Sequence, residues 1–82
     1  MSGAVTRFEP GAALARVAAT PTGYQIDTRS PHSQRAYDFS SAGECAEMAI
    51  FLRDEGRWSL RFSPGAKAVR DIVEEIDREV SA

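Results

Sequence analysis

The chain has little of the residue types that carry most protein chemistry. Among its 82 residues there is one cysteine, Cys45, and one histidine, His32. A single thiol excludes an intramolecular disulfide, and a zinc site needs several Cys or His ligands at a characteristic spacing. A glycine-rich phosphate loop is also missing, because Lys67 does not follow Gly65 directly as that motif requires. We therefore expect no catalytic residue, no metal site and no cofactor.

Long hydrophobic runs are missing as well. The N-terminal stretch MSGAVTRFEPGAALARVAA is interrupted by Arg7 and Glu9, and its apolar part is mostly alanine. It therefore does not fit a signal peptide. No run is long enough to cross a bilayer as a helix. The expectation is a cytoplasmic protein that makes no contact with membranes.

Lysine is almost absent, so nearly all of the positive charge is carried by arginine. Nine arginines and one lysine stand against twelve acidic residues, which gives a formal net charge of −2. A net negative charge argues against a protein that binds nucleic acid over its whole surface. Arginine pairs with carboxylates and phosphates through a planar fork, so local clusters of it can still bind anions.

The first half of the chain predicts strands. A hydrophobic content of 43% and a charged content of 27% indicate one globular domain over residues 1–82. Residues 1–11 fit either a frayed terminus or a short edge strand, and the sequence does not favour one over the other. Residues 12–20 favour helix by propensity, but a short glycine-containing turn and an alternating segment over 24–28 follow directly. This position favours a strand over 14–20. A polar loop over 29–34 and a third strand over 35–39 complete this half.

Residues 39–62 are the best organised stretch of the sequence. Ser41 and Glu44 fit a capping box, and Gly56 stands where a left-handed helix end is expected. The core stripe of this helix consists of Cys45, Met48, Ala49 and Leu52. The following strand, expected over 57–62, points Trp58, Leu60 and Phe62 to one side.

A second helix begins at Ser63 and Pro64, as N-cap and first helical residue. Its apolar positions are Ala66, Val69, Ile72, Val73, Ile76 and Val80. The order β-β-β-α-β-α predicts an α+β domain. Its sheet is mostly antiparallel and three- to four-stranded, with both helices on one face. The partner of the last strand is left open.

The residues that could carry catalysis have simpler interpretations. Cys45 lies on a core stripe, and the one possible base for it, His32, lies in a polar loop. Adjacent carboxylates such as Asp54 and Glu55 lie on helix faces beside arginines, whereas acid–base catalysis needs carboxyls held in a cleft. We therefore expect a protein that is not an enzyme.

Two surfaces are candidates for binding a protein partner. Ile50 and Phe51 widen the apolar arc of the first helix beyond what one sheet covers, which marks an interface with a second copy or another protein. The last helix is acidic and would suit a basic groove in a partner. Its carboxylates are Asp71, Glu74, Glu75, Asp77 and Glu79.

A third candidate surface is the outward face of the sheet, which could bind nucleic acid. The arginines that could project there are Arg16, Arg29, Arg57 and Arg61. Sheets that read single-stranded nucleic acid usually add exposed aromatic residues for stacking. Here the aromatic residues alternate to the opposite side of their strands, so nucleic acid is less favoured than a protein partner.

The layout resembles that of the small anti-CRISPR proteins carried by phages. The matching features are the segment 35–40 leading into a helix, the acidic end helix over 71–79, and the size of the chain. The resemblance implies a non-enzymatic inhibitor that acts in the bacterial host cytoplasm. It would occlude a surface of a CRISPR–Cas subunit or another nucleic-acid-processing complex. The alternative is a small nucleic-acid-binding or regulatory module that uses the sheet arginines.

Overall fold

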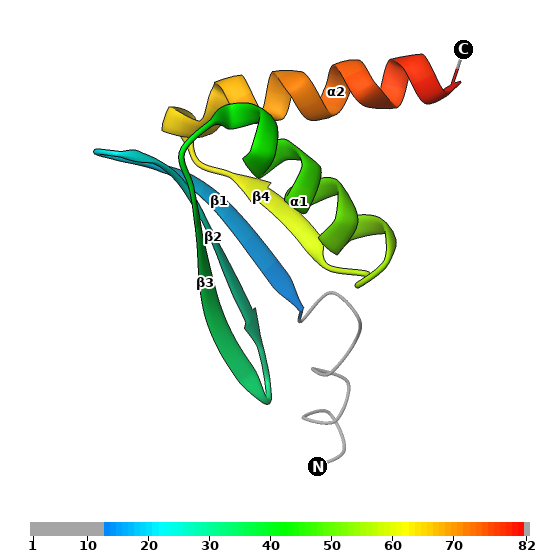
Figure 1. The fold of residues 1–82 in the computed structure, drawn as a ribbon. Coiled ribbons are helices and arrows are strands. Elements are labelled where there is room, and N and C mark those ends of the chain that lie inside the picture. Colours follow the sequence, from blue (N-terminus) through cyan, green and yellow to red (C-terminus); the bar gives the residue numbers. More distant parts are fainter. Residues whose placement is uncertain (1–12, 82) are drawn as a thin grey trace.

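The computed structural model describes residues 13–81 as a four-stranded sheet with both helices on one face (Figure 1). This confirms the predicted α+β class and the order β-β-β-α-β-α. The elements are β1 Leu14–Thr20, β2 Gly23–Ser30, β3 Ser33–Phe39, α1 Ala42–Asp54, β4 Ser59–Phe62, a 3-10 turn Pro64–Ala66 and α2 Lys67–Ser81. The choice between a strand and a frayed terminus over 1–11 lies outside the described residues.

The sheet has the order β3-β2-β1-β4. β1 pairs antiparallel with β2, and β2 pairs antiparallel with β3. β4 pairs parallel with β1, because α1 carries the chain back across the sheet from one edge strand to the other. This answers the question that the sequence left open, and it places Arg16 opposite Arg61.

The connection between β2 and β3 is shorter than the sequence indicated. The predicted polar loop over 29–34 is wrong, because only Pro31 and His32 lie between the two strands. The hydroxyl of Ser30 accepts a hydrogen bond from the backbone N–H of Ser33 at 3.2 Å. This side-chain bond closes the turn, while Pro31 stays outside the ladder, where its missing N–H costs nothing.

Half of the predicted capping box forms at the start of α1. The Ser41 hydroxyl accepts a hydrogen bond from the Glu44 backbone N–H at 3.2 Å. The Glu44 carboxylate accepts a bond from the Ser40 hydroxyl, at 3.4 Å, in place of the backbone N–H of Ser41 that the motif implies. The serine side of the cap was therefore predicted correctly and the glutamate side was not.

The end of α1 differs from the expectation at Gly56. The residue with left-handed backbone is Arg57, at φ 60°, so the predicted left-handed glycine is wrong. Gly56 is needed for space, because a Cβ there would lie 2.5 Å from Cδ1 of Trp58. The Leu52 carbonyl accepts the N–H of Gly56 at 3.1 Å and that of Trp58 at 3.0 Å, which brings the indole against the helix end.

Replacing Arg57 with glycine should stabilise the protein by about 0.5–1 kcal/mol, because a left-handed backbone strains any residue with a Cβ. Urea unfolding measures the change. The neighbouring Gly56→Ala variant should be destabilised, since its methyl group would collide with Trp58. A destabilised Arg57→Gly variant would show that the arginine side chain stabilises the loop by more than its backbone strain costs.

The core lies between the sheet and α1 and continues under the first half of α2. Its largest fully buried side chains are Ile26, Val17, Val69 and Cys45. α2 contacts α1 and crosses it near one end of the sheet, and its C-terminal half extends beyond the sheet (Figure 1). Burial of the apolar stripe of α2 is therefore expected to decrease along the helix.

Candidate interaction surfaces

The two layers of the domain carry opposite net charge. α1 and α2 together hold eight acidic and four basic side chains, a difference of −4. The four strands hold four arginines and two aspartates, a difference of +2. An overall charge near zero thus conceals an acidic helix layer and a mildly basic sheet layer. Such separation can orient a charged partner before contact.

An arginine fork neutralises part of the acidic layer and joins the two helices. Nη1 and Nη2 of Arg53 on α1 donate to the two carboxylate oxygens of Asp77 on α2, each at 2.9 Å. Nε of Arg53 also donates to Asp54 at 2.8 Å. These bonds lower the pKa of Asp77 and raise that of Arg53. Asp77 was predicted as a partner-binding residue, but its carboxylate is already paired with Arg53 inside the domain.

The fork predicts how stability depends on pH. The folded-state pKa of Asp77 lies below its ordinary value of 3.8, so the stabilisation is present above that value. It is lost as the pH falls through the folded-state pKa. In urea titrations at about pH 6 and pH 3, Arg53→Gln should lose less stability on acidification than the native chain. Arg35→Gln, which removes one positive charge on β3, should keep the native pH dependence.

Two more of the predicted acidic residues are paired along α2. Asp71 accepts a hydrogen bond from Lys67 at 2.8 Å, which lowers its pKa, and Glu74 lies 3.8 Å from Arg70. Glu75 and Glu79 form no ion pair with any residue between 13 and 81. The predicted acidic surface therefore narrows to these last two residues, one helical turn apart.

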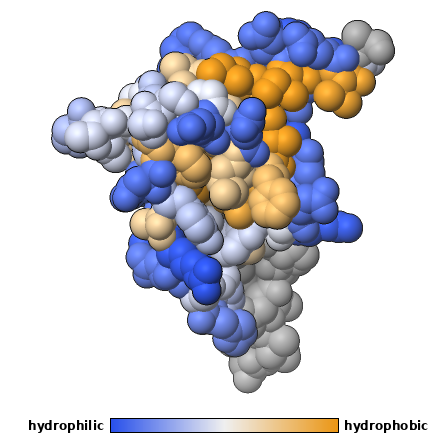
Figure 2. Space-filling model, viewed as in Figure 1, coloured by the Kyte–Doolittle hydropathy of each residue, from blue (hydrophilic) through white to orange (hydrophobic). Residues whose placement is uncertain are grey.

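The apolar stripe of α2 runs past the part of the helix that the fold covers. Val69 and Val73 are buried, whereas Ile76 is half-buried and Val80 is 80% exposed. Figure 2 shows hydrophobic surface along this helix, continuing downward over α1 on the same face. Glu75 directly precedes the half-buried Ile76, and Glu79 directly precedes the exposed Val80. The C-terminal half of α2 therefore presents an apolar ridge beside two unpaired carboxylates.

The two apolar residues predicted as an interface on α1, Ile50 and Phe51, differ in exposure. Ile50 is half-buried and packs against the core, whereas Phe51 is 57% exposed. Glu47 and Glu55 lie four residues before and after Phe51, so both fall on its side of the helix. Both are exposed, and neither forms an ion pair within the described part of the chain. Phe51 is therefore, like the end of α2, an exposed apolar residue beside carboxylates that form no ion pair with the described residues.

We call these residues together the helical surface. It consists of Phe51, Ile76 and Val80 with the neighbouring carboxylates Glu47, Glu55, Glu75 and Glu79. The sequence pattern placed Ile76 and Val80 among the apolar positions of the second helix. Such a pattern shows which side of a helix is apolar but not how far the element packed against it reaches. Only the crossing of α2 over α1 reveals that the end of the stripe is uncovered.

The outward face of the sheet carries three of the four predicted arginines. Register places Arg16 opposite both Arg61 and Asp27, and Arg29 lies 3.6 Å from Asp27. Arg57 lies instead in the exposed loop between α1 and β4. The strand aromatics share the inner side, as predicted, because they pair in register with one another or with buried residues. They are Tyr24, Tyr37, Phe39 and Phe62.

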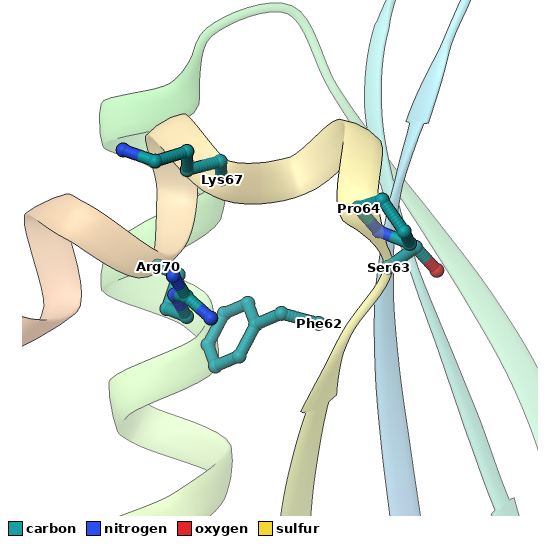
Figure 3. Close-up of a pocket in the computed structure, with 5 residues that line it drawn as sticks. All are labelled: Phe62, Ser63, Pro64, Lys67 and Arg70. Carbon is teal, nitrogen blue, oxygen red and sulfur yellow. The ribbon is translucent and has the colours of Figure 1, made fainter.

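A hollow of about 310 Å³ lies where β4 meets α2 (Figure 3). The Phe62 ring and the Arg70 side chain lie next to each other there, while Lys67 points away toward its partner Asp71. These groups include no acid–base pair and no nucleophile beside a base. The hollow therefore offers no constellation for catalysis.

The lone cysteine and histidine are not brought together. Cys45 is fully buried, as the sequence predicted, and burial raises the pKa of its thiol to about 11. It is therefore protonated at neutral pH, whereas the reactive form is the thiolate. His32 is exposed in the turn between β2 and β3. Within residues 13–81, no group of three His, Cys, Asp or Glu side chains could hold a metal ion.

No described helix is long and apolar enough to span a bilayer. Comparison of the chain with protein-family models, curated proteins and solved structures gave no significant match. The surfaces themselves are therefore the guide to the function of the chain. Among them, the helical surface combines uncovered apolar area with unpaired charge.

Proposed function

We propose that this chain is a non-enzymatic binding protein whose helical surface docks onto a basic, partly apolar surface of a protein partner. The observation that carries the proposal is the end of α2. There the apolar stripe finishes at an exposed Val80, beside Glu75 and Glu79, which form no ion pair with any residue between 13 and 81. Covering such a ridge removes apolar area from water and gives the carboxylates cationic partners.

A second copy of the chain fits this ridge less well than a basic partner does. An antiparallel two-fold pairing of α2 with itself brings the same flank of both helices together. Glu75 and Glu79 of one copy would then face the same carboxylates of the other, and like charges in contact oppose association. The homodimer that the apolar residues alone would permit is therefore disfavoured at this surface by its charge.

The class of protein partner is inferred from the usual role of basic, partly apolar surfaces, which is to bind nucleic acid. Grooves that hold nucleic acid are lined with Lys and Arg, which contact the phosphate backbone. A protein that covers such a groove with carboxylates would inhibit it by steric and electrostatic occlusion. Together with the resemblance to anti-CRISPR proteins, this makes a subunit of a CRISPR–Cas complex the first partner class to test.

The probe that tests the charge preference is a pair of fluorescent amphipathic helical peptides. Both carry the same leucines at positions i, i+3, i+4 and i+7, with lysine and arginine beside them in one peptide and glutamate in the other. Fluorescence anisotropy should show binding of the basic peptide that weakens as salt rises, and no binding of the acidic peptide. Equal binding of both peptides would overturn the proposal.

A gel-shift assay with a single-stranded oligonucleotide tests the alternative function. A nucleic-acid-binding module predicts a complex that weakens as salt rises. Failure to bind the basic peptide together with tight binding of the oligonucleotide would replace a protein partner with nucleic acid. Binding of the peptide alone would leave the proposed function as the account of the helical surface.

A further inference from the structure

We propose that Arg16, Arg61 and Ser63 form a binding site for a phosphate group on the outward face of the sheet. The site lies at the end of the parallel pair β1 and β4 and shares no residue with the helical surface. It is therefore independent of the proposed function. Its ligand class is a phosphate, either free or carried by a nucleotide or a nucleic-acid backbone.

The register of β1 and β4 brings two arginines side by side. Arg16 and Arg61 are direct partners across the parallel pair, so their side chains leave the same face of the sheet. Both are exposed, and neither forms an ion pair with any described residue. Like charges on neighbouring strands repel, which an anion bound between them would relieve.

A third donor reaches the same place from the end of β4. A hollow of about 400 Å³ is lined by Leu14, Arg16, Arg61, Phe62 and Ser63. Figure 3 shows the Ser63 hydroxyl pointing away from the Phe62 ring, which lies on the helix side of the strand. Ser63 precedes the 3-10 turn, yet its hydroxyl makes no capping hydrogen bond. It is therefore available to donate to a ligand.

The charges around the hollow suit a phosphate. Asp27 on β2 lies opposite Arg16, but its carboxylate lies 3.6 Å from a guanidinium nitrogen of Arg29. Neither Arg16 nor Arg61 forms an ion pair with this carboxylate. Two arginine forks and one hydroxyl supply more donors than the two oxygens of a carboxylate can accept. A tetrahedral phosphate has oxygens for all of them, and arginine binds this group through bidentate bonds.

The test is an NMR titration of the full chain, labelled with ¹⁵N, at constant ionic strength. The probes are inorganic phosphate, adenosine monophosphate and a thymidine oligonucleotide of about ten residues. We expect saturable shifts of the backbone amides at 14–17 and 60–63. Arg16→Gln and Arg61→Gln should each weaken binding about tenfold, and the double variant should abolish it. Ser63→Ala should weaken it by a smaller factor.

Arg35→Gln and Arg78→Gln are the matched controls, since each removes one positive charge elsewhere and should leave binding unchanged. Oligonucleotide binding that is much tighter than that of free phosphate would identify a nucleic-acid backbone as the ligand. Equal affinity per phosphate would identify a single phosphate group. The proposal is overturned if no probe shifts these amides at about 20 mM phosphate. It is also overturned if the double variant responds as the native chain does.

Discussion

The Gly23→Ala variant is expected to lose about 2–4 kcal/mol of its unfolding free energy, a large part of the stability of a domain this small. Gly23 has φ 156°, a conformation that residues with a Cβ rarely adopt. An added Cβ would lie 2.1 Å from the carbonyl oxygen of Phe39 and 3.1 Å from Cα of Ser40. Both contacts are to backbone, so no side chain can rotate away to make room.

The strands around Gly23 explain why the clash cannot be relieved cheaply. Gly23 pairs with Thr20 in the β1–β2 ladder, and the next residue, Tyr24, pairs with Phe39 in the β2–β3 ladder. Moving the backbone would disturb hydrogen bonds on both sides of β2. Urea unfolding measures the loss. Gly43→Ala is the matched control, since nothing lies within 4 Å of its Cβ position and alanine favours helix.

Unchanged stability of Gly23→Ala would contradict the close approach of β2 and β3 at this point. Gly43→Ala should instead keep or raise the native stability, by at most about 1 kcal/mol. The two variants introduce the same methyl group, so the difference between them isolates the effect of the tight approach from the general effect of replacing glycine.

The second large effect is expected on binding. The double variant Phe51→Ala, Val80→Ala should bind the basic amphipathic peptide about 100-fold more weakly, because exposed aromatic and aliphatic anchors dominate interface energies. Its unfolding free energy should stay within about 0.5 kcal/mol of the native value, since both side chains are largely exposed. Anisotropy titration and urea unfolding of the same preparation measure the two quantities.

Leu14→Ala is the control for this variant, because it removes apolar area from the outward face of the sheet and should leave peptide binding unchanged. Native-like peptide binding by the double variant would mean that the exposed apolar residues on the helices are not the docking surface. Weak binding together with a large loss of stability would mean that these residues act through the fold.

Much of the fold could be predicted because its elements have clear periods. The alternation of Trp58, Leu60 and Phe62 predicted the last strand and its inner side, although the strand begins at Ser59 and leaves Trp58 just before it. The i, i+3, i+4 spacing of Cys45, Met48 and Ala49 predicted the first helix. These patterns depend only on which side of an element is covered. Local geometry was harder to predict, since the left-handed residue is Arg57, beside the glycine that the pattern favoured.

The candidate surfaces were predictable only in part. Composition showed that the last helix is acidic. It did not show that Arg53 of α1 pairs with Asp77 while Glu75 and Glu79 have no ion-pair partner in the described part of the chain. That difference depends on how the two helices cross. The pairing of Arg16 with Arg61 likewise depends on β4 joining β1, which alternation along a single strand cannot show.

The most direct test of the docking surface is a comparison of two charge reversals on α2. One variant carries Glu75→Lys and Glu79→Lys beside the apolar ridge. The other carries Asp71→Lys and Glu74→Lys nearer the start of the helix, where each carboxylate already pairs with a basic residue of the same helix. Both change the net charge equally. We expect the first variant to bind the basic amphipathic peptide at least about tenfold more weakly than the second. Equal binding by the two variants would contradict a docking surface at the exposed end of α2.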